Sequence, residues 1–434
     1  MVEKRLFDVA QKALSMLKGE GAEKATCAVA LTRTTELNAN NGEFTLLRTL
    51  FSRSLILSGH IEGKRGSASM NDFDDESLEN AVKECMEAAR AAQSDPAWDI
   101  SDASNGGSFK DGDLEADMDA LYERTEELMN TIAEDYPKVT VEQLIVTHAN
   151  TQTVVVNTNG VQFDFERGQY SVSLSMCGVD GDEVSSLAGG GVIAADLSKP
   201  FIELGSLKYD ISSVEKQIHT KALEGKFEGT VILTPDCFGS LLYTALSSFA
   251  GEGAMINGTA IWKDKLGKQV MHPGLSVSFA PWDERIVCGQ RMTGDGYNAK
   301  DFDMVTNGVL NGFILSNYGA NKTGHLRSPN TSSAMIVAPG EKSFEQIIAG
   351  TEKGIIVGRF SGGAPSANGD FSGVAKNSFL VENGKITCAL RETMVSGNLE
   401  NMFNDLKDLS KDVVCDGMCA LPWAAFGGIT IAGK

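Results

Sequence analysis

From about Gly229 the sequence becomes rich in glycine and in short strand-forming segments, and this change in composition most limits the folds that the chain can adopt. Beyond that point the residues at 231–234, 335–338, 354–359, 385–390 and 428–432 have the β-branched character of sheet strands. Helical spacing returns only at 238–249, 343–350 and 398–408. We therefore expect a strand-rich, barrel-like second half with long glycine loops.

The first half mixes helices and strands. Apolar residues at helical spacing predict helices over 1–17, 75–93, 115–134 and 213–223. Alternating segments predict strands over 26–31, 46–59, 139–148, 153–157 and 170–176, with turns at 38–42 and 157–160. The order of helix, strands and helix occurs twice, which fits either a structural duplication or an order that α+β domains produce by chance.

A chain of 434 residues has room for two or three domains. Residues 94–114 are rich in Ser, Asp, Gly and Asn without an apolar period, so we interpret them as a surface linker. The sequence thus predicts an α+β protein. Residues 1–225 form a mixed α/β domain with an antiparallel sheet, and residues 226–434 form the strand-rich domain.

The net charge of −20 opposes direct binding to nucleic acid, and no basic cluster offsets it. The start of the chain is amphipathic and lacks the apolar run and cleavage site of a secretory signal. No later segment has the length of apolar residues that a membrane span requires. These features predict a cytoplasmic protein.

The sequence contains no local motif that indicates a particular catalytic chemistry. None of the five histidines stands in a His-Glu pair with a second His one turn later, the pattern that zinc hydrolases use. The nucleophile elbow, the Walker A loop and the dinucleotide fingerprint are also missing from the sequence. The eight cysteines form no disulfide pattern, and the spacing of Cys415 and Cys419 is not that of a zinc pair.

An ordered set of loop segments carries more information. The segments are 308–318 (GVLNGFILSNY), 323–325 (TGH), 338–340 (APG), 354–357 (GIIV), 362–363 (GG), 369–372 (GDFS), 382–384 (ENG) and 397–399 (GNL), with 157–160, 221–234 and 266–269 upstream. Together they resemble the TldD/PmbA family, also called TldD/TldE or peptidase U62 and once described as modulators of DNA gyrase. The resemblance covers nearly the whole chain.

The resemblance implies a cytoplasmic peptidase built from two related subunits. The TldD-type subunit carries His-Glu-x-x-x-His on the helix that opens the C-terminal domain, and it holds zinc with a cysteine near its C-terminus. The corresponding helix here, 238–253, contains no His, and Glu252 is its only acid, which we interpret as a capping or loop residue. We therefore expect the PmbA/TldE type, with no catalytic or metal-binding residue in this chain and zinc in a TldD-type partner.

The resemblance leaves two questions open. Cys415 and Cys419 lie where the sister supplies its cysteine, so they are either ordinary core thiols or vestigial or shared ligands. Glycine loops suit an extended peptide that binds by strand addition, and 362–372 is the best candidate. In and beside it, Gly362, Gly363 and Ser372 are candidate binding residues, with Arg359 and Asp370 as charge contacts for peptide ends. Alternatively, these glycines only form tight turns.

The leading hypothesis is the non-metal-bearing subunit of a metallopeptidase complex that processes peptides or unfolded proteins. The alternative is a non-enzymatic homodimer that binds peptides or regulates another protein, of the gyrase-modulator type. A third possibility is hydrolysis by an unrecognised nucleophile such as Cys415 or Ser372. Neither the substrate peptide nor the choice between homodimer and heterodimer can be deduced from the sequence.

Overall fold

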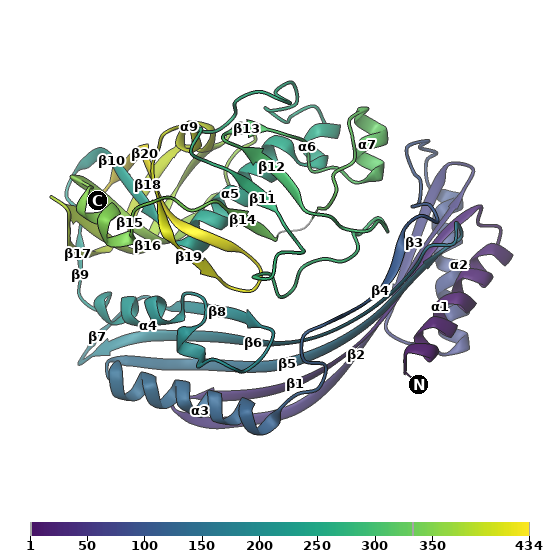
Figure 1. Ribbon diagram of the computed structural model, residues 1–434, viewed down its shortest axis with the longest axis horizontal. Coiled ribbons are helices and arrows are strands. Elements are labelled where there is room, and N and C mark those ends of the chain that lie inside the picture. The colour runs from purple at the N-terminus through teal and green to yellow at the C-terminus, as the bar shows by residue number, and fades with distance from the viewer. Residues whose placement is uncertain (1, 332–333, 434) are drawn as a thin grey trace.

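The chain forms two β-sheets, shown in Figure 1, in a computed structural model that describes residues 2–331 and 334–433. The first sheet contains β1 (Lys24–Asn40), β2 (Glu43–Ile61), β3 (Lys64–Met70), β4 (Gly106–Asp111), β5 (Val139–Asn157), β6 (Gln162–Asp180), β7 (Glu183–Val184) and β8 (Ala188–Ala194). The second contains β9 (Thr220–Ala222), β10 (Lys226–Leu233), β11 (Val277–Phe279), β12 (Phe302–Thr306), β13 (Val309–Leu310), β14 (Met335–Val337), β15 (Lys353–Gly362), β16 (Asp370–Glu382), β17 (Lys385–Arg391), β18 (Thr393–Asn398), β19 (Leu406–Cys415) and β20 (Ala420–Ala432). The helices are α1 (Val2–Gly19), α2 (Asp75–Ala91), α3 (Met118–Asp135), α4 (Leu207–Lys216), α5 (Pro235–Ala250), α6 (Glu252–Ile256), α7 (Asn317–Thr323), α8 (Phe344–Ala349) and α9 (Leu399–Asn404), with a short 3₁₀ turn at Phe201–Glu203.

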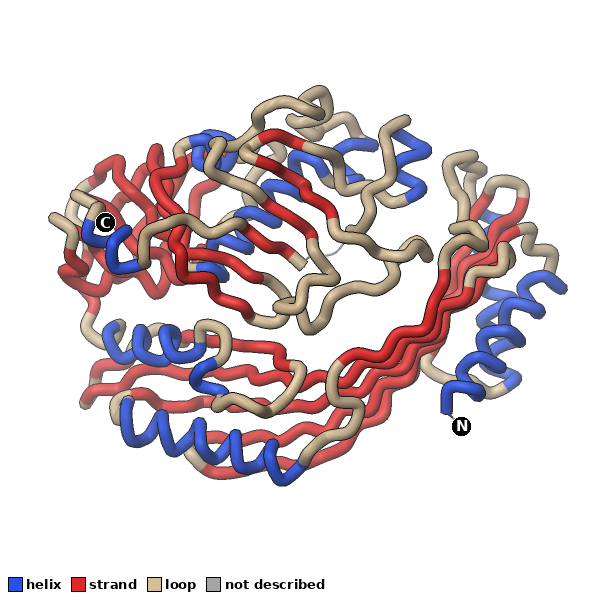
Figure 2. Tube along the Cα trace, in the orientation of Figure 1, coloured by secondary structure: helices blue, strands red, loops and turns tan. Residues whose placement is uncertain are grey.

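The first sheet has the order β3-β2-β1-β5-β6-β4 and is built around two long antiparallel hairpins, β1–β2 and β5–β6. Asn41 and Gly42 both have positive φ at the first hairpin turn, a conformation that Asn and Gly tolerate. The sheet bends along its strands into a half-barrel (Figure 2). Helices α1 and α2 pack at one end of it, and α3 and α4 pack at the other.

The second sheet is mixed and closes on itself. Strand β18 pairs with both β16 and β20, so that β10, β15, β16, β18 and β20 form a closed circuit of paired strands. Helix α5 packs against β20 and β15 of this circuit. The expected α+β fold with a barrel-like second half is confirmed.

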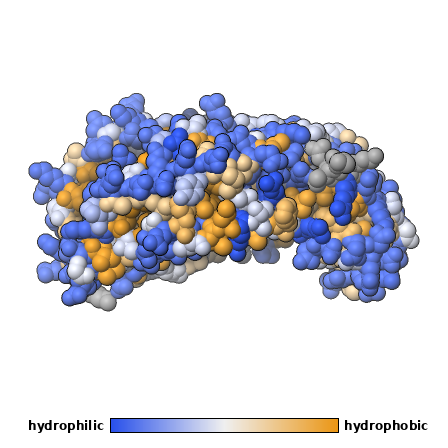
Figure 3. Space-filling model, turned by 90° about the horizontal axis from the view of Figure 1, so that it is seen from below, coloured by the Kyte–Doolittle hydropathy of each residue, from blue (hydrophilic) through white to orange (hydrophobic). Residues whose placement is uncertain are grey.

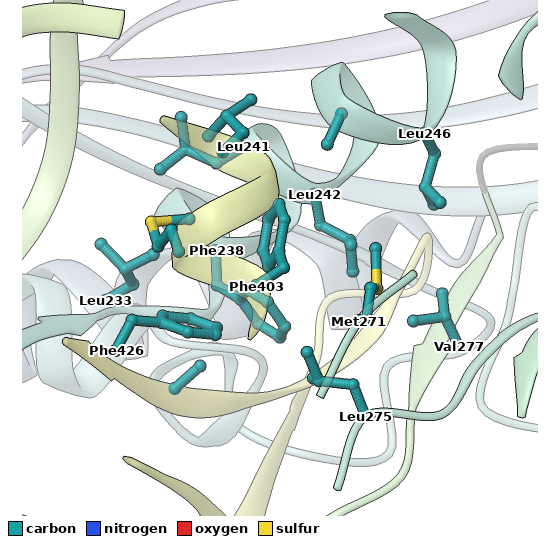
Figure 4. Close-up of a cluster of buried hydrophobic side chains, with 14 of the residues drawn as sticks. Leu233, Phe238, Leu241, Leu242, Leu246, Met271, Leu275, Val277, Phe403 and Phe426 are labelled. Atoms are coloured by element: carbon teal, nitrogen blue, oxygen red, sulfur yellow. The ribbon is translucent and has the colours of Figure 1, made fainter. Parts of the chain in front are cut away.

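Helix α5 supplies the centre of the largest core. Thr234 caps its N-terminus, Pro235 occupies its first turn, and Gly251 follows its last residue. Its buried face includes Phe238, Leu242 and Leu246, which Figure 4 shows among side chains from α9 and the barrel strands. The apolar spacing at 238–249 therefore predicted both the helix and its burial.

The expected helices over 1–17, 75–93 and 115–134 are confirmed as α1, α2 and α3. The helix expected over 213–223 lies earlier, as α4, because residues 220–222 instead form β9, which pairs with β17. The helix expected over 398–408 ends at Asn404, and Leu406 begins β19. In both places a strand pairing, of β9 with β17 and of β19 with β20, prevails over the local helical spacing.

Residues 94–114 are not a plain linker. They contain β4, which pairs in parallel with β6 at the edge of the first sheet. Asp111 at the end of β4 accepts hydrogen bonds from Arg167 of β6 and from Arg291 of the second half, both with N–O distances of 3.0 Å. This segment therefore joins the two halves. No described helix has both the length and the apolar character needed to cross a membrane.

Candidate functional site

A cavity of about 180 Å³ lies where the two halves of the chain meet, and we call it the junction cavity. Its walls come from β8 and α4 on one side and from α5, β15 and β16 on the other. The lining residues are Ala188, Gly189, Tyr209, Asp210, Ser213, Thr234, Asp236, Cys237, Ser240, Gly358, Arg359, Phe360 and Asn377. They bring carboxyl, hydroxyl and guanidinium groups around one space.

Asp210 and Asp236 provide the acidic side of the junction cavity. The Ser206 hydroxyl donates to Asp210 Oδ2 at 2.7 Å, and Gly190 of β8 leaves room for that carboxyl, since a Cβ there would lie 2.9 Å from Oδ2. Burial, followed by the charge of Asp236, raises the pKa of Asp210 to about 7. Asp210 is therefore poised to exchange a proton near neutral pH.

Asp236 lies in the first turn of α5, and its side chain reaches solvent within the cavity. Desolvation by the surrounding protein, together with the charge of Asp416, nevertheless raises the pKa of its carboxyl. No described residue forms an ion pair with Asp210 or Asp236, so neither carboxylate has a cationic partner within residues 2–331 and 334–433.

Arg359 is the cation of the junction cavity and was expected from the sequence as a contact for a peptide end. It is exposed, and its guanidinium makes no ion pair or hydrogen bond with a described residue. The register of β15 and β16 is unchanged from Val357–Ser378 to Arg359–Lys376, but Gly358 and Asn377 between these pairs are not paired with each other. Asn377 has a φ of 48°, and the Gly358 carbonyl accepts a hydrogen bond from the Thr234 hydroxyl at 3.0 Å. Arg359 therefore borders the cavity next to one unpaired position of a continuous strand pair.

The other expected binding residues lie farther along the same hairpin. Gly362 pairs with Gly373 and has a φ of 148°, and a Cβ on Gly362 would lie 2.7 Å from the Gly373 Cα. Gly363 is exposed and has open space around it. Gly362 therefore has a steric reason to be glycine, while Gly363 has none in the fold.

Asp370 and Ser372 belong to β16. Asn368 and Asn398 each donate a side-chain hydrogen bond to Asp370 at 2.9 Å, and these bonds, that from Asn398 first, lower the pKa of the carboxyl. Ser372 is exposed, and its hydroxyl makes no hydrogen bond within the described chain. The structure thus places Arg359 in the junction cavity and leaves Gly362, Gly363, Asp370 and Ser372 outside its lining.

Sequence reasoning missed the two acids of the cavity. Asp210 lies on the apolar face of α4, between Leu207 and Val214. An acid on a helix face that is otherwise apolar is the sequence signal that could have identified it. Asp236 follows Thr234 and Pro235 and looks like an ordinary acid of a helix start. Nothing local distinguishes Asp236, because its surroundings come from residues distant in the chain.

Known proteins with similar sequences and structures identify the family to which this fold is related. Residues 225–433 match the model of the PmbA/TldA metallopeptidase C-terminal domain. A metalloprotease PmbA homologue of Haemophilus influenzae is 24% identical over 433 residues, covering 90% of this chain and 88% of that protein. Residues 225–433 therefore belong to the PmbA/TldD family, and the whole chain is similar to PmbA metalloproteases.

Two solved structures share the whole fold of this chain. TldE from Thermococcus kodakarensis superposes with a TM-score of 0.85 at 17% identity, covering 98% of this chain and all of that one. A candidate modulator of DNA gyrase from Bacteroides thetaiotaomicron gives a TM-score of 0.85 at 21% identity, with both chains fully covered. A zinc metalloprotease TldD homologue of Saccharolobus solfataricus is 25% identical over 206 residues, which is 44% of this chain and 46% of that relative.

The residues of α5 and α6 do not fit a zinc ion of the kind that the name of this last relative implies. Helix α5 contains no His, and zinc sites need several His, Cys, Asp or Glu donors. Glu252, at the start of α6, accepts hydrogen bonds from the backbone N–H of Ser316 at 2.7 Å and from its hydroxyl. Within residues 2–331 and 334–433, no three potential ligand side chains converge. Glu252 thus connects α6 to the N-terminus of α7.

Neither Cys415 nor Cys419 is part of a disulfide bond. Cys415 ends β19 and borders a second, separate cavity with Arg285, while Cys419 packs against the main core. Burial raises the pKa of Cys415, and it raises the pKa of Cys419 to about 12. Both groups are therefore mainly protonated at neutral pH, which makes them poor nucleophiles.

Proposed function

We propose that this chain is the non-metal-bearing subunit of a metallopeptidase that processes peptides, with zinc and the general base supplied by a TldD-type partner. The observation that carries the proposal is helix α5. It opens the C-terminal domain of a PmbA/TldD fold without an imidazole, and the nearby Glu252 is engaged by Ser316. The hydrolytic chemistry must then come from another polypeptide.

An open strand edge supports the binding of an extended peptide. Strand β10 pairs with β15 only as far as Val357, whereas β15 continues to Gly362 and pairs there with β16 alone. One edge of residues 359–362 therefore carries no strand partner in the described chain. An added peptide strand would bind its main chain there, with Arg359 beside it and Gly363, Asp370 and Ser372 at the hairpin end.

A second unpaired edge supports association with a partner. Strand β3 pairs with β2 only over residues 55–61, so residues 43–54 of β2 form an outer edge of the first sheet. Leu47 is 62% exposed and Phe51 is 68% exposed on that edge, and Leu46 and Leu50 are exposed as well. Figure 3 shows apolar surface gathered along the face seen from below. Long apolar strand edges are aggregation sites unless another chain covers them.

The proposal is tested by purifying the chain alone and together with a sister chain that carries His-Glu-x-x-x-His. We expect the pair to contain zinc and to cleave unfolded casein, and we expect the lone chain to do neither. A pair whose sister has Gln in place of the motif Glu serves as the control and should be inactive. Stoichiometric zinc with cleavage by the lone chain would overturn the proposal.

The same β2 edge favours one alternative function, a homodimer that binds peptides or regulates another protein without cleaving anything. Two copies of this chain could pair through residues 43–54 as readily as this chain could pair with a sister chain. Light scattering on the purified chain with and without the sister distinguishes the two. A stable homodimer that the sister does not exchange into, and that binds casein without cleaving it, favours the alternative.

A further inference from the structure

The junction cavity has two poles of opposite charge that the fold leaves uncompensated. Among the described residues, none forms an ion pair with Asp210, Asp236 or Arg359, although all three line the cavity. The Arg359 guanidinium therefore does not pair with either carboxylate. Asp236 and Arg359 are exposed and Asp210 is half-buried, so a ligand can reach all three charges, and unpaired charges around one concave space are typical of ligand sites.

We propose that the junction cavity binds a zwitterionic peptide of dipeptide size, with the ammonium group on Asp210 and Asp236 and the carboxylate on Arg359. This ligand class is what a peptidase releases, but the binding is a property of this chain alone. It therefore stands or falls separately from the assignment of the metal to a partner.

The size of the cavity agrees with a ligand of this length. Its volume of about 180 Å³ would hold roughly six water molecules at about 30 Å³ each. Two extended residues span about 7 Å, which separates the two charged ends of a dipeptide enough to reach poles that do not touch.

Hydroxyl groups complete the lining. The Tyr209 ring packs against Trp423, with ring centroids 5.8 Å apart, and its hydroxyl makes no hydrogen bond with a described residue. Ser240 lies one turn after Asp236 on the same face of α5, and its hydroxyl is also unpaired in the described chain. These groups can bond the central amide of a dipeptide.

The protonation of the acids agrees with a cationic ligand. The Ser206 hydroxyl donates a hydrogen bond that lowers the pKa of Asp210, and the charge of Asp416 raises the pKa of Asp236. Burial first, and then the charge of a neighbouring acid, raises the pKa of each carboxyl group, and an ammonium group would stabilise the charged form of both. Binding should therefore strengthen as the pH rises from 6 to 7, whereas above that pH the loss of the dipeptide's own ammonium proton, with a pKa of about 7.7–8.0, opposes it.

The test is calorimetry on the purified chain with L-alanyl-L-alanine, its N-acetyl derivative and its C-terminal amide. We expect the free dipeptide to bind and each blocked form to bind at least about tenfold more weakly, because each loses one charge-assisted contact. In Arg359→Gln the amide and the free dipeptide should bind equally. In Asp210→Asn and in Asp236→Asn the penalty for N-acetylation should shrink, because one carboxylate remains, and in the double variant it should disappear.

Two matched variants control for the loss of charge. Lys208→Gln removes an exposed cation of α4, and Asp182→Asn removes an exposed acid of the β6–β7 turn, and both lie outside the cavity lining. Each should retain the full preference for the free dipeptide. Comparing probes within one variant keeps the result independent of its stability. The proposal is overturned if the unaltered chain does not bind the dipeptide at millimolar concentration, or if the blocked forms bind as well as it does.

Discussion

Asp210 shows how a single half-buried acid couples this fold to pH. An unfolded Asp has a pKa near 3.9, whereas in the folded chain burial raises the pKa of Asp210 to about 7. The folded state therefore binds the proton more tightly. The associated stability is complete below about pH 4 and is lost as the pH rises toward 7.

Asp210→Asn should remove this loss, because Asn stays neutral and still accepts the Ser206 hydrogen bond. We expect the variant to exceed the parent by about 2 kcal/mol in free energy of unfolding at pH 8, after halving the shift for partial solvent access. At pH 4 the two should be equal. Urea denaturation at both pH values measures the difference, and Asp182→Asn should show none. A variant that is less stable than the parent at pH 8 would contradict the assigned pKa.

Helix α5 depends on one hydroxyl group at its start. Thr234 Oγ1 accepts from the backbone N–H of Cys237 at 3.4 Å and donates to the Gly358 carbonyl at 3.0 Å, so it both caps α5 and holds β15. Loss of such a cap typically costs about 1–2 kcal/mol.

Thr234→Val retains the shape of the side chain but removes both bonds, and it should lower the free energy of unfolding by about 1–2 kcal/mol in urea titrations. Thr244→Val, within the same helix, removes only a bond to the Ser240 carbonyl and should change stability by less than about 0.5 kcal/mol. If the two variants lose equal amounts of unfolding free energy, the Thr234 cap does not stabilise the fold more than an ordinary side-chain hydrogen bond.

The two halves of the molecule are joined by a small ionic centre. Asp111 of β4 bonds Arg167 of β6 and Arg291 of the second half, and all three side chains are largely shielded from solvent. Arg291 also stacks over Trp282, with its guanidinium carbon 4.2 Å from the ring centroid. Removing the acid would leave two cations facing each other without compensation.

Asp111→Ala should therefore lower the free energy of unfolding by about 2 kcal/mol, less than for a fully buried pair because solvent reaches part of this site. It should also increase hydrogen exchange in residues 106–111 more than in α5. Asp182→Ala, an exposed acid, provides the reference. An unchanged exchange pattern would indicate that other contacts hold the halves together.

The outer edge of β2 gives a prediction about assembly. Leu50→Lys combined with Phe51→Lys places charge on both faces of the unpaired strand, which opposes edge pairing. We expect at least about a tenfold loss of affinity for the sister chain, measured by analytical ultracentrifugation, with little change in melting temperature because both side chains are exposed. Ile386→Lys, at a site that is 47% exposed on β17, should leave association unchanged. Unaltered association of the double variant would place the interface elsewhere.

Local order along this chain could be deduced without coordinates. Apolar residues at helical spacing predicted α1, α2, α3 and α5, and Asn and Gly at 157–160 predicted the β5–β6 turn. The absence of an imidazole from α5 was likewise evident from the residues alone. Such features depend on neighbours within one or two turns of backbone, so composition and spacing encode them directly.

The junction cavity and strand β4 depended instead on contacts between distant segments. β4 has little apolar character and forms because β6 offers it a ladder partner, and Asp210 and Asp236 meet because α4 and α5 pack from different sheets. Arg359 joins them from β15, whose register is set by its pairing with β16. Burial, charge and strand pairing at these points depend on residues that lie far apart in the chain. No short stretch of sequence contains all of those residues.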